Sequence, residues 1–192
     1  HLRFLYLDTD PDALAAASAD GALAAREVVP IRLNRSTHYL QRDGLPNVEQ
    51  WLPHGLLYKL PRNPGATNGV RAFGRLALVD NFRAVAQRVR QEVETFLSDE
   101  PLNRADQATR LGLRSNRPRA YVIAGLGGGT GGGAFLDVAF LLRRELKQVG
   151  FARPAVVGQF FVPPPDPTTG RSFPLGNSYA ALAEFYHFQA QR

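Results

Sequence analysis

The residues with the clearest chemical potential form a glycine-rich run at positions 125–133. Seven of its nine residues are glycine, and the others are Leu126 and Thr130. An apolar stretch at 120–124 precedes the run and an apolar pattern with helical spacing follows at 134–149, which predicts a strand, a tight loop and a helix. Glycine can adopt positive φ and lets an anion approach backbone N–H groups, and the first turn and dipole of a helix favour the same ligand. The stretch is therefore predicted to bind phosphate.

Other uses of a glycine run fit less well. A flexible linker is normally flanked by polar residues, whereas apolar elements flank this run directly. A P-loop needs Lys and then Ser or Thr after its last glycine, and an Ala-Phe pair stands there. Gly127, Gly129 and Gly132 meet the dinucleotide spacing G-x-G-x-x-G, but that fingerprint also needs an acidic residue at the end of the next strand. Residues 160–162 contain none, so dinucleotide binding is the weaker alternative.

Two carboxylates follow the first predicted strand. Residues 2–7 are almost continuously apolar, which is typical of a buried parallel strand, and Asp8 and Asp10 come directly after them. Asp10 can cap a helix whose first residue is Pro11. The same carboxylates could instead hold Mg²⁺ or its waters beside a phosphate, because this cation prefers oxygen ligands.

A second candidate anion site precedes a long amphipathic helix. Residues 61–69 are rich in Pro, Asn and Gly, which predicts a loop. Over residues 70–97 apolar side chains recur at spacings of three and four, which predicts one helix. No chemistry is assigned to the irregular segment 34–59, and the polar stretch 98–119 is predicted to be a link.

The remaining elements predict an α/β fold. Further strands are expected at 28–33 and 155–162, a loop at 163–176, and helices at 12–19 and from Asn177, a good N-cap. Gly150 is expected to end the helix at 134–149. A strand, a helix and a strand within residues 120–162 predict a right-handed βαβ crossover.

Composition sets limits on the class of protein. A chain of 192 residues with 44% hydrophobic content has the size of one folded domain. Absence of cysteine excludes disulfides and thiolate metal sites. The net charge is +6, but the arginines are spread along predicted helices, which favours solvated helix faces over a nucleic-acid surface. No apolar run is long enough to span a bilayer.

The heptapeptide at 127–133 resembles the signature G-G-G-T-G-[S/T/A]-G of the tubulin/FtsZ GTPase superfamily, and Gly132 is its one departure. Residues 7–10 resemble the loop after the second strand, where FtsZ-type proteins carry Asn-Thr-Asp. Residues 65–69, continued by a Gly-Arg pair at 74–75, resemble the loop that faces the γ-phosphate. Residues 173–178 resemble the loop and helix start near the ribose. The likeness spans nearly the whole chain and is greatest to divergent bacterial tubulin-like proteins.

This resemblance implies a three-layer, Rossmann-like α/β domain with a mostly parallel sheet, and it implies that residues 1–192 are a GTP-binding domain truncated at both ends. It implies GTP or GDP with Mg²⁺ as ligands, a cytoplasmic location, and a homo-oligomer or filament of the full-length protein, without nucleic acid. Asp10 is the residue it places nearest the metal. The nucleotide-site residues carried over from the family are Asp8, Thr9, Asp10, Ala66, Thr67, Asn68, Gly69, Gly127, Gly128, Gly129, Thr130, Gly131 and Asn177.

Departures from the family pattern leave alternatives open. The family's first strand and its glycine loop would lie before His1, and Phe173 and Pro174 stand about where the family carries a carboxylate for the ribose. The family's water-activating acidic residues lie beyond the nucleotide domain and act on a neighbouring subunit. No catalytic residue is therefore expected within this chain, and hydrolysis is expected only on assembly. The alternatives are an NAD-type domain of an enzyme and a tubulin-like scaffold without nucleotide turnover.

Overall fold

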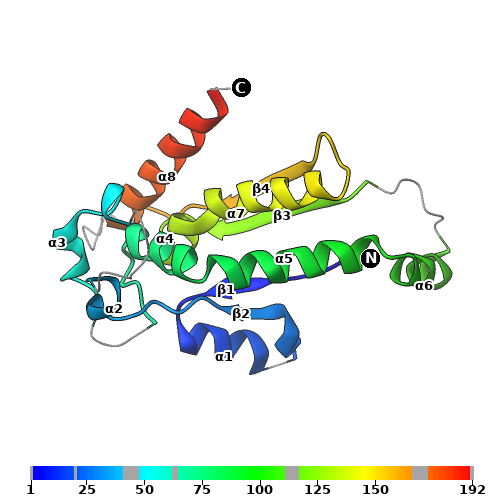
Figure 1. Cartoon of the computed structure of the whole chain (residues 1–192), viewed down its shortest axis with the longest axis horizontal. Helices are drawn as coiled ribbons and strands as arrows, with labels where there is room; N and C mark the ends of the chain where they lie inside the picture. The colour runs from blue at the N-terminus through cyan, green and yellow to red at the C-terminus, as the bar shows by residue number, and fades with distance from the viewer. Residues whose placement is uncertain are drawn as a thin grey trace.

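The chain combines helices with parallel strands, and Figure 1 shows it as a computed structural model that describes residues 2–19, 21–40, 48–61, 65–110, 117–165 and 173–190. Positions 41–47, 62–64, 111–116 and 166–172, which fall in segments predicted to be irregular or loops, lie outside the described residues. In chain order the elements are β1 (Tyr6–Asp8), α1 (Pro11–Ala19), η1 (Ala25–Glu27), β2 (Val28–Pro30), α2 (Ser36–Leu40), η2 (Val48–Gln50), α3 (His54–Leu57), α4 (Arg71–Asp80), α5 (Phe82–Leu97), α6 (Asp99–Thr109), β3 (Arg119–Gly125), α7 (Gly129–Gln148), β4 (Ala155–Phe161) and α8 (Phe173–Ala190).

The strands form two parallel pairs. β1 pairs with β2, with Leu7 opposite Val29, and β3 pairs with β4, with Val122 opposite Gly158. The predicted α/β class and the parallel pairing are confirmed. β1 and β2 are shorter than predicted because the ladder between them covers only three residues of each strand. Among the described residues the two pairs are not joined by strand hydrogen bonds, so a single sheet is not part of the observed fold.

Helices cover the two strand pairs (Figure 1), and apolar cores lie between the helices and the strands. α1 contacts the β1–β2 pair. α5 packs on the same pair through one apolar core, and α7 covers one face of the β3–β4 pair through another. Val138 and Leu142 of α7 touch both cores, so α7 connects the two halves of the molecule. The buried members of these cores are Ile31, Leu78, Val85, Ala86, Val89, Ala134 and Leu141 in one and Val122, Leu126, Phe135 and Ala181 in the other.

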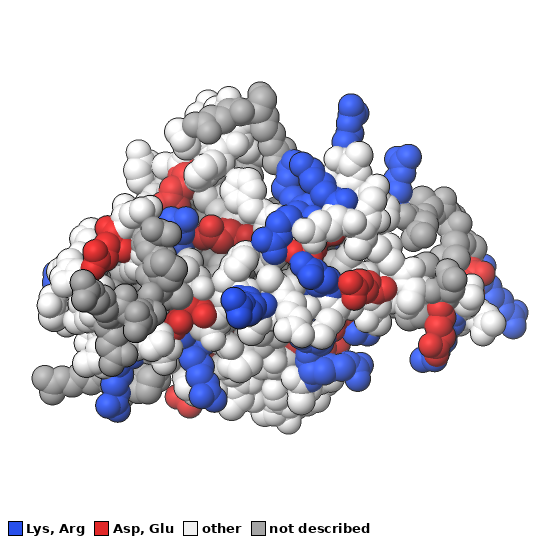
Figure 2. Space-filling view, in the orientation of Figure 1, with Lys and Arg blue, Asp and Glu red and all other residues white. Residues whose placement is uncertain are grey.

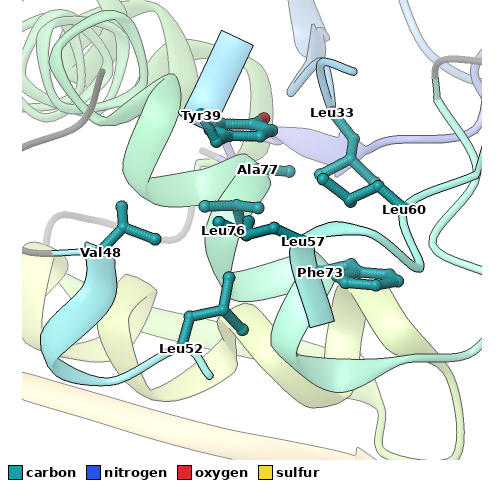
Figure 3. Packing of buried hydrophobic residues seen from close by; sticks show 9 residues of the cluster. All are labelled: Leu33, Tyr39, Val48, Leu52, Leu57, Leu60, Phe73, Leu76 and Ala77. Atoms are coloured by element: carbon teal, nitrogen blue, oxygen red, sulfur yellow. The ribbon is translucent and has the colours of Figure 1, made fainter. Parts of the chain in front are cut away.

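The described part of the segment 34–59, to which the sequence analysis assigned no chemistry, packs against α4. Tyr39 and Asn34 bind the carboxylate of Asp80 at the end of α4, at 3.1 and 2.7 Å. Burial raises the pKa of Tyr39, and the negative charge of Asp80 raises it further. The hydroxyl of Tyr39 therefore stays protonated and can donate a hydrogen bond. Figure 3 shows the core that this segment forms with α4, made of Leu33, Tyr39, Val48, Leu52, Leu57, Leu60, Phe73, Leu76 and Ala77. The segment thus supports the helix that follows the second candidate loop.

Several helix bounds differ from the sequence-based predictions. The helix predicted over 70–97 is two helices, because the amide of Asn81 donates to the carbonyls of Ala77 and Arg32 and ends the first one. The polar stretch 98–119 contains α6, whose polar composition gave no apolar periodicity. α8 begins at Phe173, so Asn177 lies inside the helix and is not its N-cap. The predicted helix end at Gly150 is confirmed, with φ +99° and a bond from its N–H to the carbonyl of Lys147.

Charged side chains of both signs are interspersed on the face shown in Figure 2. Arginines of the central helices pair with carboxylates: Arg88 with Glu92, and Arg90 with Glu145 at 2.9 Å. Both carboxylates are buried, so these arginines stabilise contacts within the protein as well as facing solvent. None of the helices in the described part of the chain is long and apolar enough to cross a membrane.

Candidate functional site

A cavity of about 540 Å³ lies where β1 and β3 end. Its volume falls within the range of small-molecule sites, roughly 300–1,000 Å³. Of the residues predicted for the site, all except Gly127 and Asn177 line it. The lining residues are Tyr6, Leu7, Asp8, Thr9, Asp10, Ala66, Thr67, Asn68, Gly69, Ile123, Ala124, Gly125, Gly128, Gly129, Thr130 and Gly131. Three stretches far apart in the sequence therefore meet at the carboxyl ends of two parallel strands, where ligands of α/β proteins bind.

The N-terminus of α7 forms one wall of the cavity. Gly128 is the N-cap, with extended backbone (φ −89°, ψ 172°), and no side chain caps the helix. First-turn N–H groups have no partner within their helix, and those of Gly129, Thr130 and Gly131 border the cavity. The dipole of this 20-residue helix adds positive potential at the same point. This wall is suited to an anion.

The glycines of this wall do not supply the positive φ that the sequence analysis expected of them. None of those at 127–133 has positive φ; among the glycines of the described chain, positive φ occurs at Gly21, Gly65, Gly69 and Gly150. The helix also begins at Gly129, earlier than the predicted start at 134. The prediction that this loop exploits positive φ is therefore wrong.

Close backbone packing explains the glycines instead. A Cβ at Gly131 would lie 2.7 Å from the carbonyl oxygen of Gly125, and one at Gly132 would lie 2.6 Å from that of Leu126. A Cβ at Gly133 would overlap the backbone at Arg71, in the first turn of α4. Tertiary contact thus outweighs the poor helix propensity of glycine. Gly132, the departure from the family signature, sits where a side chain has no room.

The turn before α4 forms a second wall. Asn68 and Gly69 both have positive φ (48° and 78°), and the N–H of Val70 donates to the carbonyl of Thr67 at 2.9 Å. Positive φ at both central positions is the type I′ pattern, which favours Asn followed by Gly. Thr67 is 7% exposed and packs against Gly129, where any Cβ would overlap its hydroxyl. The turn is therefore held directly against the start of α7.

The loop after β1 forms the third wall. Asp8 accepts hydrogen bonds from the N–H groups of Thr9 (2.7 Å) and Asp10 (3.2 Å) and from the hydroxyl of Tyr6 (2.9 Å). Burial, followed by the bond to Asp8, raises the pKa of Tyr6 to about 12, so that hydroxyl stays a donor. The hydroxyls of Thr9 and Thr130 lie 2.8 Å apart and join this loop to α7. Asp8 thus shapes the loop.

Asp10 caps α1, as the sequence predicted. Its carboxylate accepts from the N–H of Asp12 at 3.0 Å, and its carbonyl accepts from Leu14 at 3.0 Å. It also lines the cavity and is partly exposed. One partly exposed carboxylate is a suitable ligand for Mg²⁺, which usually combines one or two carboxylates with phosphate oxygens and water. Among the described residues no group of three or more His, Cys, Asp or Glu could hold a metal alone.

The two arginines at the start of α4 are turned to protein partners. Arg71 donates to the carbonyl of Gly132 (2.9 Å) and to both carboxylate oxygens of Glu184 (3.2 and 2.6 Å). Arg75 donates to Asp137 at 3.0 Å and lies 4.9 Å from the centre of the Trp51 ring. No Lys or Arg is among the lining residues that the structure describes. Positive potential in the cavity therefore comes from backbone N–H groups and from any bound cation.

The two predicted residues outside the lining bind protein atoms. Asn177 is 9% exposed, and its amide nitrogen donates to the carbonyls of Gly69 (2.8 Å) and Gly127 (3.0 Å). A Cβ at Gly127 would lie 2.9 Å from the ring of Pro163. The predicted list of site residues also left out part of the lining near the ends of the strands, namely Tyr6, Leu7, Ile123, Ala124 and Gly125, although Gly125 opens the run that was predicted to bind phosphate. Their place directly before two predicted loops is the signal that could have found them.

Comparison with known proteins gives one result. Searches of curated proteins and of solved structures found no match. The family described as "Tubulin like" matches residues 1–192, which is the full length of the chain. Because this match covers the whole chain, the chain belongs to the tubulin-like family.

Proposed function

We propose that this protein binds a guanine nucleotide, GTP or GDP, with Mg²⁺ in the cavity at the ends of β1 and β3. The observation that carries the proposal is the meeting of three walls, namely the loop at 8–10, the turn at 66–69 and the start of α7 at 128–131. Membership of the tubulin-like family supports guanine as the base. The proposal includes residues 1–192 as the nucleotide domain of a larger three-layer Rossmann-like fold, in a cytoplasmic protein.

The phosphates would lie on the start of α7. The N–H groups of Gly129 and Gly131 and the hydroxyl of Thr130 would donate to phosphate oxygens. The turn with Ala66, Thr67, Asn68 and Gly69 would face the terminal phosphate. Asp10 would hold Mg²⁺ directly or through water. The cation would neutralise phosphate charge, because the described lining contains no Lys or Arg to do so. Gly127 and Asn177 would shape these walls from behind.

Hydrolysis would depend on self-assembly, because each carboxylate that the structure describes at or beside the cavity already binds a protein partner. A general base must lie within hydrogen-bond reach of the attacking water. The carboxylate of Asp8 accepts three local hydrogen bonds, and Asp10 caps α1. Asp137 lies on α7 outside the lining and is paired with Arg75. We propose that a neighbouring subunit of a homo-oligomer or filament supplies the missing group.

Titration of the full-length protein tests nucleotide identity. Heat changes on adding GTP, GDP or NAD, each with and without Mg²⁺, would be measured. Binding of GTP that strengthens with Mg²⁺ is expected, because the lining offers carboxylates and no basic side chain. Tight binding of NAD without GTP would contradict the proposal and favour a dinucleotide enzyme. The sequence Val-Pro-Pro-Pro after β4, without a carboxylate, argues against that outcome.

Turnover tests the link to assembly. GTPase activity of the full-length protein should rise more steeply than linearly with protein concentration, because two subunits complete each site. A segment of residues 1–192 should show no turnover at any concentration. Turnover by the segment that is linear in its concentration would contradict assembly coupling. GTP binding by the full-length protein without turnover at any concentration would identify a scaffold that keeps the site.

A further inference from the structure

Two walls of the cavity, which already touch through Thr67 and Gly129, are also bridged by α8, a helix outside the lining. Asn177 in its second turn donates one hydrogen bond to the carbonyl of Gly69 and one to that of Gly127. Gly69 belongs to the turn before α4, and Gly127 belongs to the loop before α7. Both partners are carbonyl oxygens, so only the amide nitrogen of Asn177, which carries two hydrogens, can satisfy them together.

A second contact from α8 reaches the same two helices. Glu184 forms a bidentate pair with Arg71, the first residue of α4, and Arg71 also donates to the carbonyl of Gly132 in the first turns of α7. The side chain of Arg71 is 14% exposed and that of Glu184 is 51% exposed. Asn177 is the more buried of the two α8 residues, with 9% exposed. The stronger constraint therefore comes from Asn177, because polar groups buried in protein depend on their hydrogen bonds.

We propose that Asn177 is a positioning residue that holds the turn at 66–69 and the start of α7 at the spacing a ligand needs. The choice of GTP as ligand rests on the proposed function, whereas the positioning role does not. A direct contact of Asn177 with a ribose, which the family resemblance suggested, would require its amide to leave two carbonyls in a buried setting. Because α8 is bonded to both walls, a ligand that bridges them also favours the bonded position of α8. Coupling of this kind is reciprocal, so displacing α8 lowers ligand affinity by the factor by which the ligand favours its bonded position.

Two variants and a matched control separate positioning from general stability. Asn177→Asp keeps the size of the side chain but has no donor and places negative charge against two carbonyls. Asn177→Ala removes the contact altogether. Ser178→Ala is the control, because Ser178 is 2% exposed and bonds only the carbonyl of Pro174 within the same helix. All three would be made in the full-length protein.

The first measurement is amide hydrogen exchange by mass spectrometry without nucleotide. Asn177→Ala and Asn177→Asp should raise exchange in peptides covering 66–70 and 127–131 by about tenfold or more, the effect of losing one or two net hydrogen bonds. Exchange in α5 should stay unchanged in both Asn177 variants. In Ser178→Ala, exchange should stay unchanged in both walls. Unchanged exchange in both walls of the two Asn177 variants would overturn the proposal, as would a uniform rise across the whole protein.

The second measurement is the affinity for GTP with Mg²⁺. It should fall about 10- to 30-fold in both Asn177 variants and less than about threefold in Ser178→Ala. A loss of affinity with unchanged exchange would identify Asn177 as a direct ligand and overturn the positioning role. Raised exchange with unchanged affinity would overturn the link between α8 and the cavity. Failure of the unmodified protein to bind GTP would reject the proposed function, while the exchange measurement would still decide the role of Asn177.

Discussion

Gly128 offers a substitution that separates anion binding from packing. It lines the cavity and is exposed, and a Cβ built on it meets nothing within 4 Å. Its neighbour Gly129 would bring a Cβ into overlap with Thr67, so a variant there confuses lost binding with lost structure. Gly128 is also the N-cap of α7, with φ −89°, which any residue can adopt. A side chain at this position enters the ligand space and leaves the fold in place.

Gly128→Asp should weaken nucleotide binding without lowering stability. Two like charges about 5 Å apart repel by roughly 3 kcal/mol at an effective dielectric constant near 20. Because Gly128 is exposed, we expect solvent to reduce this to about 1.5–2 kcal/mol, which corresponds to roughly 10- to 30-fold weaker binding. The same carboxylate is a good N-cap and interacts favourably with the helix dipole, by about 0.3–1 kcal/mol. Affinity and stability should therefore change in opposite directions.

Gly128→Asn is the matched control, since asparagine is also a good N-cap and has nearly the same size but no charge. Calorimetric titration with GTP and Mg²⁺ should show a clear loss of affinity for Gly128→Asp and a smaller loss for Gly128→Asn. Thermal unfolding should show that both variants are at least as stable as the unmodified protein. Equal affinities of the Asp and Asn variants would refute anion binding at this helix start. Unfolding of both variants would refute the open geometry around Gly128.

Three further predictions address packing, metal and pH. Gly133→Ala should lower the free energy of unfolding by about 1–3 kcal/mol in denaturant titrations, because its Cβ overlaps the backbone of α4; Gly150→Ala, where a Cβ meets nothing, tests positive φ alone. Asp10→Asn should keep the α1 cap but reduce the gain in GTP affinity on adding Mg²⁺, and an unchanged gain would exclude Asp10 as the metal residue. Burial raises the pKa of Glu145, but bonds from Arg90 and Arg144 outweigh it and lower the pKa overall. The stability that ionised Glu145 contributes is present above its pKa in the unfolded chain and is lost as pH falls through its pKa in the folded protein. Glu145→Gln should therefore flatten the decline of the unfolding free energy below about pH 4.5. An equally steep decline in the variant would contradict this.

Local chemistry made several features predictable from the sequence. The order strand, glycine run and helix at 120–149 is observed because apolar periodicity and glycine content are local signals. Asp10 before Pro11 and the glycine at 150 predicted a helix start and a helix end correctly, since caps depend on a few adjacent residues. The family resemblance of three stretches, 7–10, 65–69 and 127–133, selected most of the cavity lining, and family membership over residues 1–192 agrees with it.

The tertiary structure decided how those residues are used. Glycines stand at 129 and 131–133 in the helix because the start of α7 packs too closely for a Cβ on Thr67, on the carbonyls of Gly125 and Leu126 and on the backbone of α4, and no single element predicts those contacts. Asn81 ends α4 because its amide also reaches Arg32, a partner distant in sequence. The amide of Asn177 binds two carbonyls that come from two separate loops, one before α4 and one before α7. Sequence patterns specify local conformation and burial, whereas the distances between backbones of separate elements exist only after packing, and these distances fix the cavity.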